Sequence, residues 1–171
     1  PLLRPEVLSY RQSPEFRDGD YILGYMLNAG FAEEVKSWHA KNPSVPLRFF
    51  WDNAAEAPVK VVDDTLSFYY LDDMEFLRQM AGCMAYASTA GFESICEAMY
   101  LGKPLMMVPS HIEQKCNAYD ATRFDAAVES ETFDLDVLLS FARDGKFRRD
   151  EGFPAWALSA AEVFAKELES M

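Results

Sequence analysis

The chain has 171 residues, half of them apolar, and its 28 acidic against 16 basic side chains give a formal net charge of −12. This length and apolar content are typical of one folded domain with a substantial core. The negative charge repels nucleic-acid phosphates and anionic lipids, so we expect no nucleic-acid partner and no electrostatic attachment to a membrane. No apolar run approaches the ~20 residues needed to span a bilayer.

The cysteines and histidines predict neither a disulfide framework nor a metal site. Cys83, Cys96 and Cys116 are odd in number and fall in predicted helices or at their ends, so we expect three buried, reduced thiols. His39 and His111 lie far apart, and no close Cys or His pair has metal-ligand spacing. We therefore expect no structural metal, no cofactor and, since no signal peptide is visible in these residues, a cytoplasmic location.

The N-terminal part predicts a linker followed by the first α/β unit. Residues 1–17 contain three prolines and little periodicity, so we expect an interdomain linker remnant lying on the surface, ahead of a domain at 18–171. The expected elements that follow are a strand at Tyr21–Met26, a turn at 28–30, a helix at Phe31–Lys41 and a strand at Val45–Trp51.

The remaining pattern continues this alternation of strands and helices. We expect a short strand after Lys60, a strand at 67–70, and a helix that opens at Asp72-Asp73 with Asp73 as its N-cap. Further on, we expect strands at 84–87, 105–108 and 126–129, and helices at 92–101, 113–124, 135–143 and 154–171; the last has an apolar side formed by Leu158, Ala161, Phe164, Ala165 and Leu168.

This alternation predicts an α/β fold of the Rossmann-like kind, with three layers (α/β/α) and a mostly parallel sheet. Ligands of such sheets bind outside the carboxyl ends of the strands, near the topological switch point. The turns after Tyr25, Tyr70, Ser88 and Val108 all follow strands and should open on this one edge.

The stretch from Met84 to Ala118 organises the chain. It begins with a strand, a tight turn, a helix and a second strand at 105–108, and the turn looks like a phosphate site. Small residues end at Gly91, and a helical pattern follows that is closed by Gly102 and Pro104. The first amides of such a helix are unpaired and favour an anion, so the amides of residues 92–94 could bind a diphosphate. The alternatives are tight strand–helix packing for Gly91 and a local cap for Ser94.

An ordered set of short motifs spans this unit: Thr89-Ala90-Gly91-Phe92-Glu93-Ser94, Glu97-Ala98, Gly102-Lys103-Pro104, Val108-Pro109, Glu113-Gln114 and Asn117-Ala118. The set resembles the donor-binding signature of GT-B-fold glycosyltransferases. It is closest to the bacterial and archaeal branch related to the UDP-glycosyltransferases and to the N-acetylglucosaminyltransferase of peptidoglycan synthesis. The resemblance implies the C-terminal, nucleotide-sugar-binding half of a two-domain enzyme, whose missing N-terminal domain is a partner and carries the catalytic base.

The same resemblance implies roles for individual residues. Glu97 would accept both hydroxyls of a ribose, the alternative being a solvated charge on the helix face. Gln114 would read hydroxyls of the donor sugar, with Glu113 before it and Asn117 supporting the loop; the alternative is an ordinary helix N-terminus with favourable charge.

Other candidates would line the rim of the same cleft. Tyr70, Leu71 and Asp72 would form the rim that holds a uracil, and Asn28 could offer a polar contact. Ser110 and His111 would face the same cleft, although a lone histidine is not assigned as a base. Many relatives carry His where this chain has Thr89 and Asn where it has Glu93. Because Glu93 is an anion, backbone amides would have to supply most of the diphosphate binding.

Glycosyl transfer from a UDP-sugar to an unknown acceptor is the function that these motifs favour. No Ser-His-Asp set and no carboxylate pair of defined separation supports a hydrolase within this chain. A nucleotide-sugar 2-epimerase shares the fold, and a noncatalytic Rossmann-like binding module would be indicated by a crevice after Gly91 filled by the protein's own side chains, such as Glu93. The apolar final helix would dock on the missing half or form a homodimer.

Overall fold

The computed structural model describes residues 3–53, 55–123 and 125–170, and within them seven strands form one sheet. The sheet order is β3-β4-β2-β1-β5-β6-β7. The strand bounds are β1 (Ile22–Met26), β2 (Leu47–Trp51), β3 (Val59–Val61), β4 (Leu66–Tyr70), β5 (Ala85–Ser88), β6 (Leu105–Met107) and β7 (Ala127–Glu129).

All neighbouring strands pair in parallel except β3, which forms an antiparallel edge on β4. Without β3, the six parallel strands have the order 3-2-1-4-5-6 of a doubly wound dinucleotide-binding sheet. The chain winds outward from β1 to β4 and then returns to β5 on the other side of β1, so the topological switch point lies between β1 and β5. The predicted fold class is confirmed.

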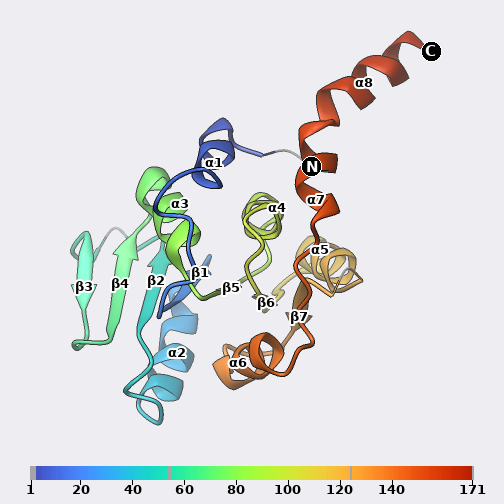
Figure 1. Cartoon of the computed structure of the whole chain (residues 1–171). Coiled ribbons are helices and arrows are strands. Elements are labelled where there is room, and N and C mark those ends of the chain that lie inside the picture. The colour runs from blue at the N-terminus through green and yellow to red at the C-terminus, as the bar shows by residue number, and fades with distance from the viewer. Residues whose placement is uncertain (1–2, 54, 124, 171) are drawn as a thin grey trace.

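Helices cover both faces of the sheet, which gives the three layers (Figure 1). The side chains of Leu23 and Tyr86 enter one apolar core, and those of Ile22 and Ala85, one residue earlier on each strand, enter a second core on the opposite face. The first core is covered by α1 (Pro5–Tyr10), α3 (Asp73–Gly82), α4 (Phe92–Tyr100), α5 (Ile112–Thr122) and α7 (Gly152–Leu158); the second is covered by α2 (Ala32–His39) and α6 (Leu135–Arg143).

The N-terminal segment is more ordered than the sequence indicates. Proline stands at the first position of α1, where its missing N–H costs nothing, and Val7 is fully buried in the core against α3. The amide of Arg17 donates to the Ala81 carbonyl, and the buried Lys103 ammonium donates to the Arg17 carbonyl at 2.7 Å. The sequence pattern predicts no helix here, so α1 is a difference from the prediction, while the assignment of this segment as an interdomain linker remnant stays a prediction. Pro1 lies outside the described residues.

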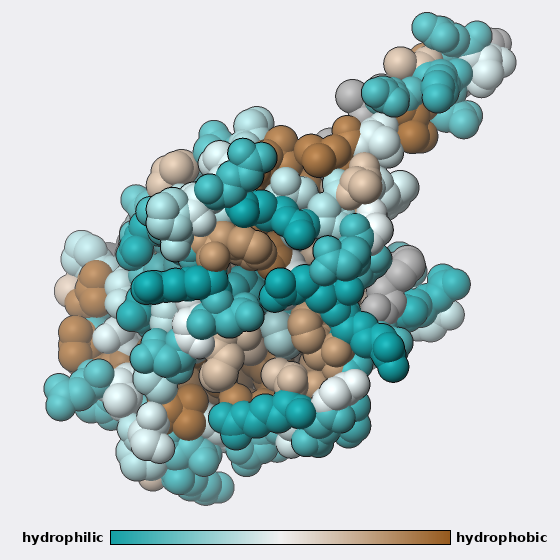
Figure 2. Space-filling view, in the orientation of Figure 1, coloured by the Kyte–Doolittle hydropathy of each residue, from teal (hydrophilic) through white to brown (hydrophobic). Residues whose placement is uncertain are grey.

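The C-terminal helix is also different from the prediction. Instead of one helix at 154–171, the chain forms α7 and then α8 (Ala160–Glu169), which leads away from the body (Figure 1). The predicted apolar side is not buried, because Leu158, Phe164 and Leu168 are exposed; α8 carries hydrophobic residues among hydrophilic ones on the face drawn in Figure 2. Met171 and the side chain of Ala161 lie outside the described part.

Smaller differences concern helix ends. Asp72, rather than Asp73, caps α3, since its Oδ1 accepts the Glu75 amide at 2.8 Å. The predicted helix end at Phe124 lies outside the described residues. Among the residues that are described, no helix combines the length and apolarity needed to cross a membrane.

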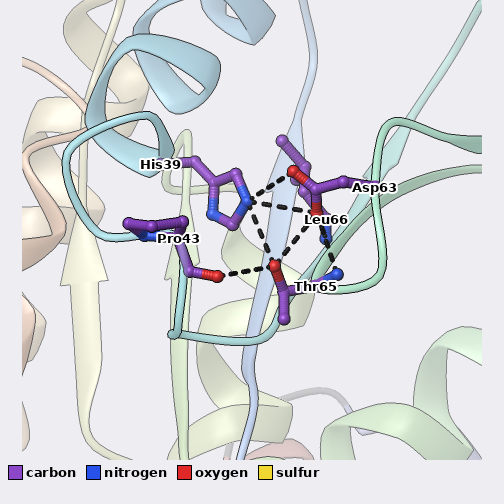
Figure 3. Close-up of polar contacts among 5 residues, drawn as sticks. All are labelled: His39, Pro43, Asp63, Thr65 and Leu66. Atoms are coloured by element: carbon purple, nitrogen blue, oxygen red, sulfur yellow. Dashed lines mark hydrogen bonds and ion pairs between the residues drawn. The ribbon is translucent and has the colours of Figure 1, made fainter.

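A polar cluster fastens the turn between β3 and β4 to the end of α2 (Figure 3). His39 Nε2 lies 3.0 Å from Asp63 Oδ2, and Asp63 Oδ1 accepts the amides of Thr65 and Leu66. The Thr65 hydroxyl donates to the Pro43 carbonyl at 2.8 Å. Asp63 and Thr65 share the same histidine nitrogen, so the group lacks the two-nitrogen relay of a catalytic triad; it lies at the amino edge of the sheet and is structural.

We expect Asp63→Asn to lower stability in a pH-dependent way. The Thr65 amide above all, with the Thr65 hydroxyl, His39 and the Leu66 amide, lowers the pKa of Asp63 from 3.8 to about 2. This carboxylate therefore stabilises the fold above its ordinary pKa, and the contribution is lost as the pH falls toward 2. Urea unfolding should show that the variant's loss in free energy of unfolding, relative to the parent, is largest near neutral pH and becomes smaller in acid. Asp64→Asn, at the exposed neighbour, is the matched control, and an equal deficit at all pH values would contradict the explanation.

The cysteines are all free, but only Cys83 and Cys96 are buried. Cys116 is exposed on α5, so the prediction of three buried thiols is wrong for this residue. Helix α5 contributes few side chains to the core, and Cys116 falls on its outer side.

The thiols should therefore differ in reactivity. Burial raises the pKa of Cys83 to about 12 and that of Cys96 to about 11, which leaves almost no thiolate at neutral pH. Titration of the folded chain with an aromatic disulfide reagent should label Cys116 fast and the other two only on unfolding. Cys116→Ser should remove the fast phase, and a fast phase that persists in this variant would contradict the assignment.

Candidate functional site

The carboxyl edge of the sheet brings together the turns that follow β1, β4 and β5. The amide of Leu27, after β1, donates to the Thr89 hydroxyl, after β5, at 3.3 Å. This bond crosses the switch point. A cavity of about 220 Å³ opens beside it and is lined by Arg4, Tyr25, Leu71, Asp73, Phe76, Gly91, Phe92, Glu93 and Ser94.

The sharp turn before α4 is made by Ala90 and not by Gly91. Ala90 has φ 65°, in the left-handed region that L-residues adopt at a cost, whereas Gly91 has φ −66°. The Ser88 hydroxyl accepts the Ala90 amide at 2.9 Å, and the Asn117 side chain donates to the Ala90 carbonyl at 3.1 Å. These two bonds hold the strained residue. The sequence pattern predicts that Gly91 lets the backbone turn sharply, and this prediction is wrong because Ala90 adopts the left-handed conformation.

The start of α4 at Gly91 is open. A Cβ at this position would meet only the Ser94 hydroxyl, at 3.7 Å, and no described side chain caps the helix. The amides of the first helical turn, at residues 92–94, are therefore available to an anion, and the helix dipole favours one there. The Ser94 hydroxyl donates to the Gly91 carbonyl at 3.1 Å, and Glu93 is exposed rather than filling the crevice.

Glu97 lies one turn further along α4, and its side chain is 0% exposed. Arg4 donates to both carboxylate oxygens, with Nε 2.6 Å from Oε1 and Nη2 2.8 Å from Oε2. Burial raises the pKa of Glu97, and the paired guanidinium opposes that rise. The hydrogen bond to Glu97 in turn raises the pKa of Arg4. Glu97 is thus not the solvated surface charge that was the alternative reading.

Arg4 is the residue of this site that sequence reasoning missed. It stands 93 positions before Glu97, in a segment without periodicity, so no spacing relates the two. Its Nη1 also lies 3.3 Å from Asp73, and its Nε 4.0 Å from Glu93. One guanidinium therefore faces three carboxylates beside the cavity. The only sequence signal is a basic residue at the start of a proline-initiated helix.

The loop before α5 does not line this cavity. Gln114 is buried, and its Oε1 accepts both the amide and the hydroxyl of Ser110, at 2.8 and 2.9 Å. His111 and Glu113 are exposed. The Gln114 carbonyl thus shapes its own loop, and the sugar-reading roles of these residues stay predictions.

The residues expected to contact the uracil lie around a neighbouring cavity of about 720 Å³. Tyr70 and Leu71 line it and are partly exposed, while Tyr69 stacks on Phe50 with ring centroids 5.1 Å apart. Asn28 is exposed, and its Oδ1 accepts the Gly30 amide at 2.8 Å, which caps the short 3-10 helix at Ala29–Phe31. Its observed role is structural.

Residues 1–144 match the family model described as "Glycosyl transferase family 1". The chain belongs to this family. No curated protein matches the chain.

Solved structures of glycosyltransferases share the fold of this glycosyl transferase family 1 member. The kitacinnamycin glycotransferase has a TM-score of 0.66 at 15% identity, and the match covers 86% of this chain and 43% of that one. Spinosyn rhamnosyltransferase SpnG complexed with thymidine diphosphate has a TM-score of 0.54 at 15% identity, and the match covers 87% of this chain and 43% of that one. UGT89C1 of Arabidopsis thaliana complexed with UDP has a TM-score of 0.56 at 16% identity, and the match covers 92% of this chain and 42% of that one. The chain spans less than half the length of these structures.

The Ala90 turn of this family member can be tested by two substitutions. Ala90→Val should lower the free energy of unfolding by about 2 kcal/mol or more, because a β-branched side chain is strained at positive φ and overfills a buried site. Ala90→Gly should stay within about 1 kcal/mol of the parent, because relief of strain offsets the lost methyl. Urea unfolding measures both, and equal losses would contradict a left-handed Ala90.

Proposed function

We propose that this chain is the donor-binding half of a glycosyltransferase that transfers a sugar from UDP to an acceptor. The observation that carries the proposal is the pairing of an uncapped helix start at Gly91 with a buried carboxylate, Glu97, one turn beyond the first residues of the same helix. Membership of the family, over most of the chain, supports the reaction type.

The helix start suits the diphosphate of the donor. Its amides point to the carboxyl edge of the sheet, where the α4 dipole favours negative charge. When the bond to the sugar breaks, the diphosphate leaves with additional negative charge, and fixed amide dipoles stabilise it without reorganising. The exposed side chain of Glu93 can turn to solvent, which limits its repulsion of the phosphates.

Glu97 favours a uridine donor over a thymidine donor. The two comparison complexes contain one of each, thymidine diphosphate in SpnG and UDP in UGT89C1. Uridine offers a 2′,3′-diol, while thymidine lacks the 2′-hydroxyl. A carboxylate has two oxygens that can accept two neighbouring hydroxyls, so Glu97 would gain one more hydrogen bond from UDP.

The other predicted contacts complete the donor site in this proposal. Tyr70 and Leu71 would border the uracil, and the Nε2 group of Gln114 would donate to a sugar hydroxyl while Oε1 holds the loop. The catalytic base and the acceptor site would come from an N-terminal domain, and the exposed apolar residues of α8 would dock on it.

We expect Glu97→Gln to weaken UDP binding about tenfold, because one charge-assisted hydrogen bond is lost and one is weakened. The affinity for TDP should fall less than the affinity for UDP, so the variant should prefer UDP by a smaller factor than the parent does. Isothermal calorimetry with UDP and TDP measures both affinities. Glu93→Gln, one turn earlier on the same helix and exposed, is the matched control and should bind UDP at least as tightly as the parent.

Two results would count against the proposal. A folded parent chain that gives neither heat nor chemical-shift changes at millimolar UDP would refute donor binding. Equal losses of affinity in the Glu97 and Glu93 variants would remove Glu97 from the ribose site.

A further inference from the structure

The carboxylate proposed to read the ribose is closed in this structure. Glu97 is 0% exposed although it lies near the cavity at the start of α4, and Arg4 covers it. The guanidinium uses two parallel N–H groups, one to each carboxylate oxygen. A ribose diol would need the same two oxygens from the same bidentate edge.

We propose that Arg4 gates the donor site: its guanidinium occupies Glu97 in the empty protein and must withdraw before the ribose hydroxyls can bind. This inference rests on the proposed function and adds a residue outside every motif of the donor signature. The donor competes with an arginine of the same chain, which stands directly before α1.

Arg4 is the partner that can move. Glu97 is held in the middle of α4, between residues that are buried in the core. Arg4 precedes the first turn of α1, has extended backbone angles and is 21% exposed. Rotation of its long side chain needs no change in the sheet or in α4.

The guanidinium has two other carboxylate partners close by. Asp73 and Glu93 are 3.3 and 4.0 Å from Arg4 and are themselves 74% and 61% exposed. When Arg4 leaves Glu97, it can pair with either carboxylate at the rim instead of losing all its partners. The exchange therefore replaces a buried ion pair by an exposed one, while the ribose hydroxyls satisfy Glu97.

The gate makes donor affinity depend on the N-terminal segment. Part of the binding free energy is used to break the Arg4–Glu97 pair, so the apparent affinity is lower than that of the open site. A change that removes the pair should thus tighten the binding of a ligand that uses Glu97 and carries no phosphate. Uridine is such a probe, because it has the diol but no phosphate that could respond to the loss of a positive charge.

The first test is a uridine titration followed by NMR. Arg4→Ala should bind uridine about three- to tenfold more tightly than the parent. The uridine affinity of Arg4→Lys should lie between those of the parent and of Arg4→Ala, because an ammonium cannot make the planar bidentate hydrogen bond to both Glu97 oxygens. Arg11→Ala is the control, because Arg11 donates to the Tyr100 carbonyl at 3.1 Å and makes no hydrogen bond to Glu97. The affinity of this variant for uridine should equal that of the parent. Equal or weaker uridine binding by Arg4→Ala would overturn the gate.

The second test needs no substitution. The Nε–H signal of Arg4 in the parent chain should be protected from exchange in the empty state and should shift and lose protection when UDP binds. If UDP binds and this signal stays unchanged, the gate is wrong and the donor proposal stands. If UDP does not bind at all, the donor proposal itself fails. This measurement also decides the question if Arg4→Ala does not fold.

Discussion

The switch point between β1 and β5 is the constraint on which the site depends. Crossovers on its two sides run in opposite directions along the sheet, so the turns after the two strands separate and leave room between them. The bond from the Leu27 amide to the Thr89 hydroxyl joins these turns, and the left-handed Ala90 then sends the chain into α4. The position of an uncapped helix start beside a cavity follows from this geometry.

Electrostatics sets the character of the site. The chain has a net charge of −12, and Asp73 and Glu93 are among the residues that line the cavity, with Glu97 beside it. An anionic ligand can bind there only where fixed dipoles and a nearby cation outweigh this charge. The α4 amides provide the dipoles, and Arg4 provides the cation, so Arg4 both balances the carboxylates and covers one of them.

Most of the fold could be predicted because its elements have local signals. The strands from β1 to β7 are short apolar runs, and Gly102 closes α4 with φ 63°, as expected for a glycine after a helix. The failures occur where an element depends on distant partners. Helix α1 exists because Val7 is buried against α3, and the final helix divides into α7 and α8, whose apolar residues stay exposed.

The sequence by itself determined the α/β class, the strand–turn–helix around Gly91 and the presence of Glu97 on that helix, because periodicity and turn residues are local properties. Only the tertiary structure decided that Ala90 makes the turn, that Gln114 bonds its own loop and that Arg4 reaches Glu97. Each of these depends on atoms brought together by packing. No spacing along the chain encodes a contact between residues 93 positions apart.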